Sequence, residues 1–164
     1  MSEFTIRPPK PEELAAAGEV TVEAYVDGGL LTMDNGYEHE LRDTARRVEL
    51  AELLVAVDTG GEVLGSVTIA SPGTEYAELS HEGELEFRML AVSPAARGRG
   101  VGEALTRAVL ARGREIGACR VVLCSLDSMK PAHRLYERIG FTRLPDRDWT
   151  PFPGVTLIAY GLTL

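Results

Sequence analysis

Residues 84 to 102 read ELEFRMLAVSPAARGRGVG, and the expected fold is built outward from this stretch. Charged and apolar residues alternate from Glu84 to Met89, which is the period of a β-strand with two different faces. Pro94 ends the strand, because proline cannot donate to a sheet ladder. Glycines then occupy every second position from residue 98 to residue 102, so bare backbone N–H groups at a helix start can close on an anion.

The glycine turn fits one phosphate-binding pattern better than the others. It is not a P-loop, because no Lys-Ser or Lys-Thr pair follows the glycines. It is not a dinucleotide-binding fingerprint either, since that pattern would need a glycine at Glu103. The turn reads R-x-x-G-x-G, formed by Arg97, Gly100 and Gly102 directly after an apolar strand and Ser-Pro. Taken alone, this stretch is also consistent with a surface turn whose arginines only improve solubility.

Length and composition predict one folded domain over residues 1–164. Of the 164 residues, 45% are hydrophobic and 26% are charged, as in ordinary globular proteins. The sequence has no 18-residue apolar run and no signal-peptide pattern, so we expect a cytoplasmic protein without a membrane partner. Cys119 and Cys124 lie five residues apart in one expected buried strand, which predicts no disulfide. Without a Cys and His cluster, we expect no metal site.

Charge is distributed unevenly along the chain. The net charge of −8 argues against nucleic acid as the main partner. Residues 1–86 contain 5 Lys and Arg against 19 Asp and Glu, whereas residues 87–164 contain 12 against 6. If the two halves stay apart in space, one would attract a cation and the other an anion; if they mix, the asymmetry has no consequence.

The order of expected elements predicts one mixed α/β sheet. Strands are expected over residues 4–7, 52–57, 63–69, 84–92 and 120–125, from residue 141 onward, and over 155–162. Helices are expected over residues 11–27, 37–49, 100–116 and 131–139. Strand 84–92, its helix and strand 120–125 form a right-handed βαβ unit. The helix over 37–49 should bury Leu41, Ala45 and Val48, which share one side at helical spacing.

A second motif, LYERIGF at residues 135–141, follows the glycine turn. LYE-x-x-GF after R-x-x-G-x-G, each on the appropriate elements, resembles the GNAT acyltransferase superfamily over residues 84–141. The whole chain resembles actinobacterial members whose acceptor is unassigned. This resemblance implies a GNAT-like, strongly twisted central sheet flanked by about four helices, in the order β-α-α-β-β-β-α-β-α-β-β.

The resemblance also implies acetyl-CoA as the acyl donor and co-substrate. Its diphosphate would bind the backbone amides of the glycine turn, with two arginines adding charge. That segment comprises Arg97, Gly98, Arg99, Gly100, Val101 and Gly102. Leu90, Ala91 and Val92 match the strand that pairs with the pantetheine arm, a strand that usually carries a bulge. Ser128 stands where many members have an asparagine near this arm, which puts that contact in doubt.

Acyl transfer from a thioester to an amine needs a base, a site for the oxyanion and an acid for the leaving thiolate. An alkyl amine with a pKa of ~10.4 is neutral only about once in 2500 molecules at pH 7. By the family match, Glu86 is the expected base, directly or through water, with Glu84 as the alternative, or no single residue is essential. The Leu90 N–H is the expected oxyanion donor. Tyr136 is the expected general acid, although it could simply be a core aromatic.

The predicted function is therefore an N-acyltransferase that acetylates a primary amine on a small molecule or a protein. The alternative is a non-catalytic acyl-CoA-binding sensor or interaction module. A toxin that acetylates aminoacyl-tRNA is disfavoured by the acidic net charge. Cys119 and Cys124 lack a neighbouring His and are expected in the core, so direct attack in a ternary complex is expected. His133 is expected on the surface, and many relatives form a homodimer, which this sequence leaves open.

The acceptor itself is not encoded in a recognisable motif. In this fold the variable segments shape the acceptor pocket, and here these are expected to be residues 28–40, 70–83 and 145–155. Tyr37, Tyr76 and Trp149 could line such a pocket or serve as packing residues. The length of the transferred acyl group also stays open.

Overall fold

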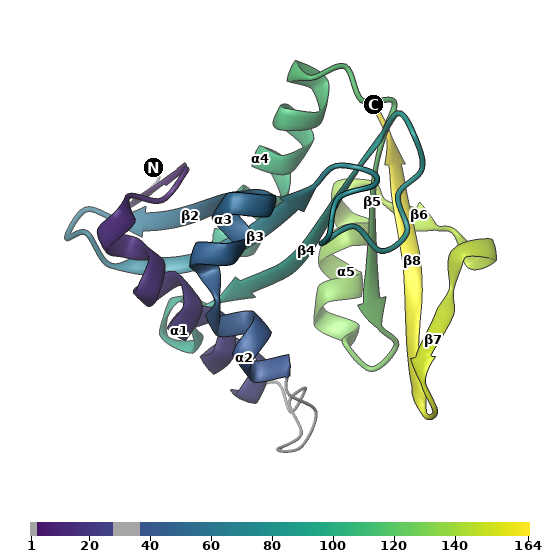
Figure 1. The fold of residues 1–164 in the computed structure, drawn as a ribbon. Coiled ribbons are helices and arrows are strands. Elements are labelled where there is room, and N and C mark those ends of the chain that lie inside the picture. The colour runs from purple at the N-terminus through teal and green to yellow at the C-terminus, as the bar shows by residue number, and fades with distance from the viewer. Residues whose placement is uncertain (1–2, 28–36) are drawn as a thin grey trace. The chain divides into compact units, whose positions relative to one another are not determined.

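The computed structural model describes residues 3–27 and 37–164 and divides into two compact units. The first unit contains residues 1–69 and 89–108, and the second contains residues 70–88 and 109–164. Strand β4 (Glu84–Val92) and helix α4 (Val101–Glu115) each begin in one unit and end in the other (Figure 1). The units are therefore interleaved along the chain. We propose that they form one domain, as the sequence predicts.

Three antiparallel strands form the sheet of the first unit: β1 (Phe4–Arg7), β2 (Glu52–Asp58) and β3 (Val63–Ala70). The turn η1 (Pro11–Glu13) leads from β1 into helix α1 (Leu14–Asp27), as the proline and the acids of the first turn predict. Helix α1 packs on the sheet through a buried apolar cluster. This cluster comprises Ala17, Val20, Leu53, Val55, Val57 and Val63.

The helix predicted over residues 37–49 is broken into two. Helix α2 (Tyr37–Arg42) ends before Asp43, whose side chain accepts the Arg46 N–H and caps helix α3 (Thr44–Leu50). The predicted apolar face is wrong in its second half, because Ala45 and Val48 are exposed. The restart at the cap instead turns Thr44 and Arg47 inward, where Arg47 is fully buried.

The second half of β4 lies beside β3 in the first unit. The Ser93 N–H donates to the Leu64 carbonyl at 2.8 Å, and Gly65 allows an even closer approach. A Cβ at Gly65 would lie 2.6 Å from the Ala91 carbonyl oxygen and close to Val101 of α4. Ser66, the next residue of β3, instead contacts Thr21 of α1 at 3.0 Å. Helices thus cover both faces of this strand, with α1 on one side and the start of α4 on the other.

The second unit is built around β5 (Arg120–Leu126) and β8 (Val155–Thr163). Strand β5 runs parallel to the first half of β4, with Glu86 opposite Val122, and antiparallel to β8 over seven residue pairs. The short strands β6 (Thr142–Arg143) and β7 (Trp149–Phe152) also pair with β8 (Figure 1). Strand β7 was not predicted. The predicted class, a mixed α/β sheet flanked by helices, is confirmed.

Two helical segments cover one face of this second sheet. In α4, Gly113 sits against Val121 and Leu85, while α5 (Lys130–Ile139) lays Tyr136 against Phe87. Leu85 and Phe87 thus form the apolar face of β4, as their alternation predicts. The remaining turns are η2 (Pro94–Ala96) and η3 (Pro145–Arg147). Within the described ranges, no helix has the length and apolarity that crossing a bilayer requires.

Candidate active site

The glycine turn predicted to bind a diphosphate lies in the first unit, between η2 and α4. Gly98 and Gly100 have φ values of +81° and +80°, which favour glycine over any other residue. Nothing lies within 4 Å of a Cβ built at either position, so the space above the turn is open. The first backbone N–H groups of α4 have no partner within the helix. The turn and these N–H groups together suit an oxygen-rich anion.

The two arginines of the turn are exposed and pair with acids of the same unit. Arg97 contacts Asp27 at the end of α1 at 2.5 Å, and Arg99 contacts Glu3 at 3.4 Å. Exposed pairs of this kind contribute little and exchange partners readily. Val101 is buried, whereas Gly102 is half-buried at the start of α4. Both arginines can therefore turn to a diphosphate without breaking a strong interaction.

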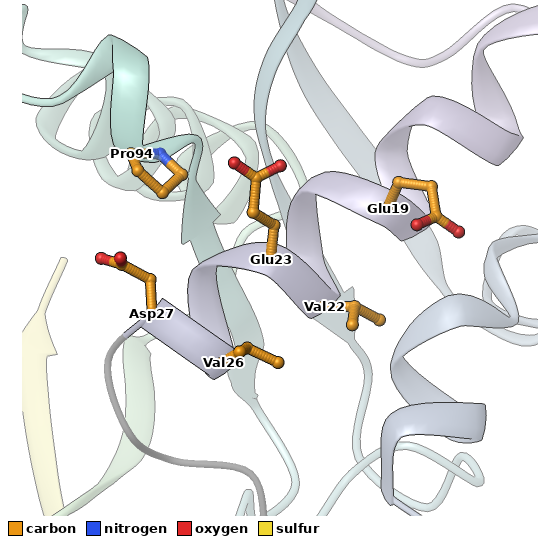
Figure 2. Close-up of a pocket in the computed structure, with 6 residues that line it drawn as sticks. All are labelled: Glu19, Val22, Glu23, Val26, Asp27 and Pro94. Atoms are coloured by element: carbon orange, nitrogen blue, oxygen red, sulfur yellow. The ribbon is translucent and has the colours of Figure 1, made fainter.

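A hollow that sequence reasoning did not anticipate lies beside this turn. It has a volume of about 490 Å³ and is lined by five residues of α1 together with Pro94 (Figure 2). Glu23 and Asp27 extend on the side of α1 that faces Pro94. The three acids that line it follow one another at intervals of four residues along α1, and so do the two valines, which places them on neighbouring faces of the helix. This spacing could have predicted the hollow from the sequence. The lining residues are Glu19, Val22, Glu23, Val26, Asp27 and Pro94.

Strand β4 changes character where the residues expected to pair with pantetheine begin. Met89 has a φ of +56° and is the only non-glycine residue with positive φ among those described. Beyond it, Ala91 is buried, while Leu90 and Val92 are half-buried. A left-handed residue inside a strand interrupts the regular ladder, which is the local irregularity expected of this strand.

Tyr136 lies in an aromatic cluster of the second unit. Its ring centroid is 5.9 Å from that of Phe87, 5.9 Å from that of Phe141 and 6.0 Å from that of Tyr160. Only 5% of the residue is exposed. Burial raises the pKa of Tyr136 above its ordinary value, and the neighbouring Cys124 and Tyr160 add to the shift. The phenol therefore stays protonated at physiological pH and can act as a hydrogen-bond donor.

Cys124 contacts Glu78, and its pKa is affected by Glu78 and Glu86, two carboxylates of the same unit. Its thiol donates to Glu78 Oε1 at 3.5 Å and also accepts from the Trp149 indole. Burial raises the pKa of Cys124 to about 12, and the charges of Glu78 and Glu86 act in the same direction. The thiol is thus protonated at neutral pH and unsuited to act as a nucleophile.

Glu86 is fully buried and binds the backbone of the preceding loop. Its Oε1 accepts the N–H groups of Glu78, Leu79 and Ser80 at 2.9 to 3.1 Å, and Oε2 accepts the Glu78 N–H at 3.0 Å. Oε1 is therefore saturated, whereas Oε2 retains acceptor capacity. The loop over residues 70–83 is more than a connector, because three of its amides are fixed on this carboxylate.

Glu84, the alternative base, is engaged in a different way. Arg147 binds both of its oxygens, at 2.6 and 2.9 Å, and the His81 N–H donates at 2.8 Å. Burial alone would raise the pKa of Glu84, but the hydrogen bonds from Arg147 and His81 outweigh it and leave the pKa below its ordinary value. A carboxylate held by a bidentate arginine is a poor proton acceptor. Both oxygens of Glu84 are thus bound by an arginine, whereas Oε2 of Glu86 accepts only one backbone N–H.

The other candidate residues fall in mixed surroundings. Ser128 is exposed in the turn after β5, and Trp149 is 36% exposed, whereas Tyr76 is buried. Residues 28–36 and the Tyr37 side chain lie outside the described residues, so that part of the predicted acceptor region is not described. The described residues contain no group of three or more acidic, His or Cys side chains arranged to hold a metal ion.

Two expectations about single residues are wrong. His133 was expected on the surface but is 6% exposed, with Nε2 2.9 Å from the Leu126 carbonyl, and burial lowers the pKa of its ring. Cys119 was expected in the core but is exposed, because β5 begins only at the next residue.

Comparisons with known proteins show the family and the fold of this chain. The model of the acetyltransferase (GNAT) family matches residues 23–141. A mycothiol acetyltransferase of Pseudarthrobacter chlorophenolicus is 39% identical over 94 residues, which are 57% of this chain and 28% of that protein. The chain thus spans less than a third of the length of that relative.

Solved structures show the same fold. A GNAT acetyltransferase from Staphylococcus aureus Mu50 superposes with a TM-score of 0.78 at 14% identity, over 98% of this chain and 99% of that one. The protein yncA from Salmonella typhimurium, solved with its cofactor acetyl-CoA, superposes with a TM-score of 0.71 at 22% identity, over 99% and 95% of the two chains. At these identities the likeness establishes the fold.

Proposed function

This chain belongs to the acetyltransferase (GNAT) family, and on that premise we propose that it transfers an acetyl group from acetyl-CoA to a primary amine. The observation that carries the proposal is the open glycine turn at the start of α4. Positive φ at Gly98 and Gly100, with open space above both, leaves the backbone amides accessible to a diphosphate. The glycine turn therefore suits the diphosphate of acetyl-CoA, the acyl donor that the family uses.

We assign the donor site to the segment from Leu90 to Gly102 and to Ser128. Arg97 and Arg99 exchange Asp27 and Glu3 for the diphosphate, because charge-assisted bonds to a phosphate are stronger than exposed ion pairs. The backbone groups of Leu90, Ala91 and Val92 bind the pantetheine arm. Ser128 contributes an exposed hydroxyl.

In the proposed reaction the amine nitrogen forms a bond to the acetyl carbon and the carbon–sulfur bond breaks. A water on Glu86 Oε2 relays the amine proton to the Glu86 carboxylate, which later releases it to solvent, since Oε1 is already saturated by three amides. The Leu90 N–H stabilises the oxyanion. Tyr136 donates a hydrogen bond to the departing thiolate and keeps its proton, because burial raises its pKa, and the thiolate takes a proton from solvent. The protonated state of Cys124 supports direct transfer without an acyl-enzyme.

We further propose a cationic small molecule or a protein amine as the acceptor. The net charge of −8 and the acidic residues of the hollow on α1 favour a positively charged amine over a polyanion such as tRNA.

The test combines acetyl-CoA with a panel of amines and follows both thiol release and product mass. Gly100→Asp places a side chain and a negative charge in the turn and should abolish acetyl-CoA binding. Gly61→Asp is the matched control, because Gly61 also has a positive φ, +87°, and nothing within 4 Å of an added Cβ. Gly61→Asp should bind acetyl-CoA as the wild type does.

Two results would contradict the proposal. Undiminished binding by folded Gly100→Asp would place the donor site elsewhere. Acetyl-CoA binding by the wild type without thiol release above background, for any amine in the panel, would identify a sensor in place of an enzyme.

A further inference from the structure

Arg47 of α3 is a fully buried cation held by three different groups of the first unit. Its Nη1 donates to Thr68 Oγ1 at 3.1 Å and to Met89 Sδ at 2.9 Å, and its Nη2 donates to the Leu41 carbonyl at 2.8 Å. The residue has 0% exposure. Burying an ionised guanidinium costs free energy, so we ask which group its directed hydrogen bonds hold in position.

One of these partners, Met89, has the least favourable backbone of the described chain. It alone among the described non-glycine residues has a positive φ, +56°, and it lies within β4, where extended backbone is the rule. The left-handed conformation is unfavourable for a residue with a side chain, and it persists only when its surroundings impose it. The Met89 side chain is 4% exposed, and Thr68 Oγ1 also contacts its sulfur, at 4.0 Å.

The peptide that follows Met89 carries the N–H of Leu90. A left-handed residue breaks the alternation of a strand, so the backbone of Met89 decides the direction in which this N–H points. Arg47 and Thr68 both contact the sulfur of Met89 and contact each other, so they hold the Met89 side chain in one position. A side chain fixed in this way limits the backbone conformations that are open to Met89.

We propose that Arg47 is a positioning residue for acetyl transfer. It holds Met89 in its left-handed conformation and so directs the Leu90 N–H at the oxyanion. This inference rests on the proposed function, in which Leu90 is the oxyanion donor. Arg47 touches neither substrate nor reacting atom and acts only through Met89.

The experiment reads the donor directly and needs no acceptor. Wild-type protein is saturated with acetyl-CoA labelled with ¹³C at the thioester carbonyl, and infrared difference spectra record the carbonyl stretch of the bound donor. A hydrogen bond from Leu90 shifts this band to lower frequency. Arg47→Met keeps the length and apolar stem of the side chain but removes the clamp, so most of the shift should disappear while the acetyl-CoA Kd stays within about twofold.

Two further variants and one control make the result specific. Arg47→Lys, which keeps a donor and the charge, should restore part of the shift. Met89→Leu removes the sulfur acceptor alone, should reproduce the loss, and serves if Arg47→Met fails to fold. Arg46→Met is the control, because Arg46 is the exposed neighbour on the same helix. Once an acceptor is known, kcat should fall about 10- to 100-fold in Arg47→Met and in Met89→Leu, while the KM for acetyl-CoA stays unchanged.

The outcomes separate this inference from the proposed function. A carbonyl shift that persists in all folded variants overturns the role of Arg47 and leaves the acetyltransferase proposal intact. A wild type that binds acetyl-CoA with no shift removes the Leu90 donor, and the inference with it, while thiol release still tests the activity. A wild type that does not bind acetyl-CoA refutes both.

Discussion

Among single residues, Tyr136 has the surroundings of a hydrogen donor that never ionises near neutral pH. Burial raises the pKa of its phenol, so Tyr136→Phe removes a proton that is present throughout the working range. We expect kcat to fall about 10- to 100-fold, because the departing thiolate loses a hydrogen bond, with an unchanged Kd for acetyl-CoA. Steady-state kinetics and calorimetry measure the two quantities.

Tyr160→Phe provides the control for that experiment. Tyr160 belongs to the same aromatic cluster, with its ring centroid 6.0 Å from that of Tyr136, and its hydroxyl contacts Glu137 at 3.4 Å. It should retain nearly full turnover. Equal losses in the two variants would mean that Tyr136 supports packing only.

The sequence predicts some of these residues and hides others for a physical reason. Motif spacing predicts roles for Arg97, Gly100 and Tyr136, because these residues match the motifs of the GNAT family. It could not show that three loop amides bind Glu86, since backbone donors leave no mark on residue type. Arg47 was missed because helical patterning assumes that apolar side chains point inward, and here a charged one does.

At the scale of elements, Glu13 ties the start of the first helix to strand β1. Its carboxylate binds both terminal nitrogens of Arg7, each at 2.8 Å, and accepts the Lys10 N–H at 2.7 Å. The hydrogen bonds from Arg7 and from the Lys10 backbone lower the pKa of Glu13 from 4.5 to about 2. A lowered folded-state pKa means that this stabilisation is complete above pH 4.5 and is lost as the pH falls towards 2.

We therefore expect Glu13→Gln to destabilise the protein by about 1–2 kcal/mol at pH 7, a value reduced by the partial exposure of the pair. The difference from the wild type should shrink between pH 4.5 and pH 2 in urea unfolding curves. Glu12→Gln, at the exposed neighbouring position, is the control and should change little. A Glu13→Gln deficit that is independent of pH would rule out the ionised carboxylate as its source.

Most element boundaries follow from local signals, and the exceptions have identifiable causes. Prolines and glycines fix the ends of α1, α4 and α5. The break between α2 and α3 depends on a single cap, Asp43, within a sequence that otherwise continues the helical pattern. Strand β7 escaped prediction because Pro151 lies within it, and proline in a strand is tolerated only away from a full ladder.

For the whole molecule, the interleaving of the two units predicts cooperative unfolding. Strand β4 and helix α4 each contribute residues to both units, so loss of either unit removes half of an element from the other. Fluorescence of Trp149, the single tryptophan, reports on the second unit, while far-UV circular dichroism reports on both. The two signals should change at the same urea concentration. Separate midpoints would show that the units fold independently.

The carboxylate that anchors residues 78 to 80 has a consequence for how selectivity can diversify. Its partners are main-chain amides, which every residue except proline supplies, so these hydrogen bonds do not depend on the side chains of Leu79 and Ser80, although the Ser80 hydroxyl is buried. A randomised library at these two positions should therefore yield many folded variants. If the acetyltransferase proposal holds, side-chain changes at these positions offer a way to alter acceptor preference while the backbone of the loop stays in place.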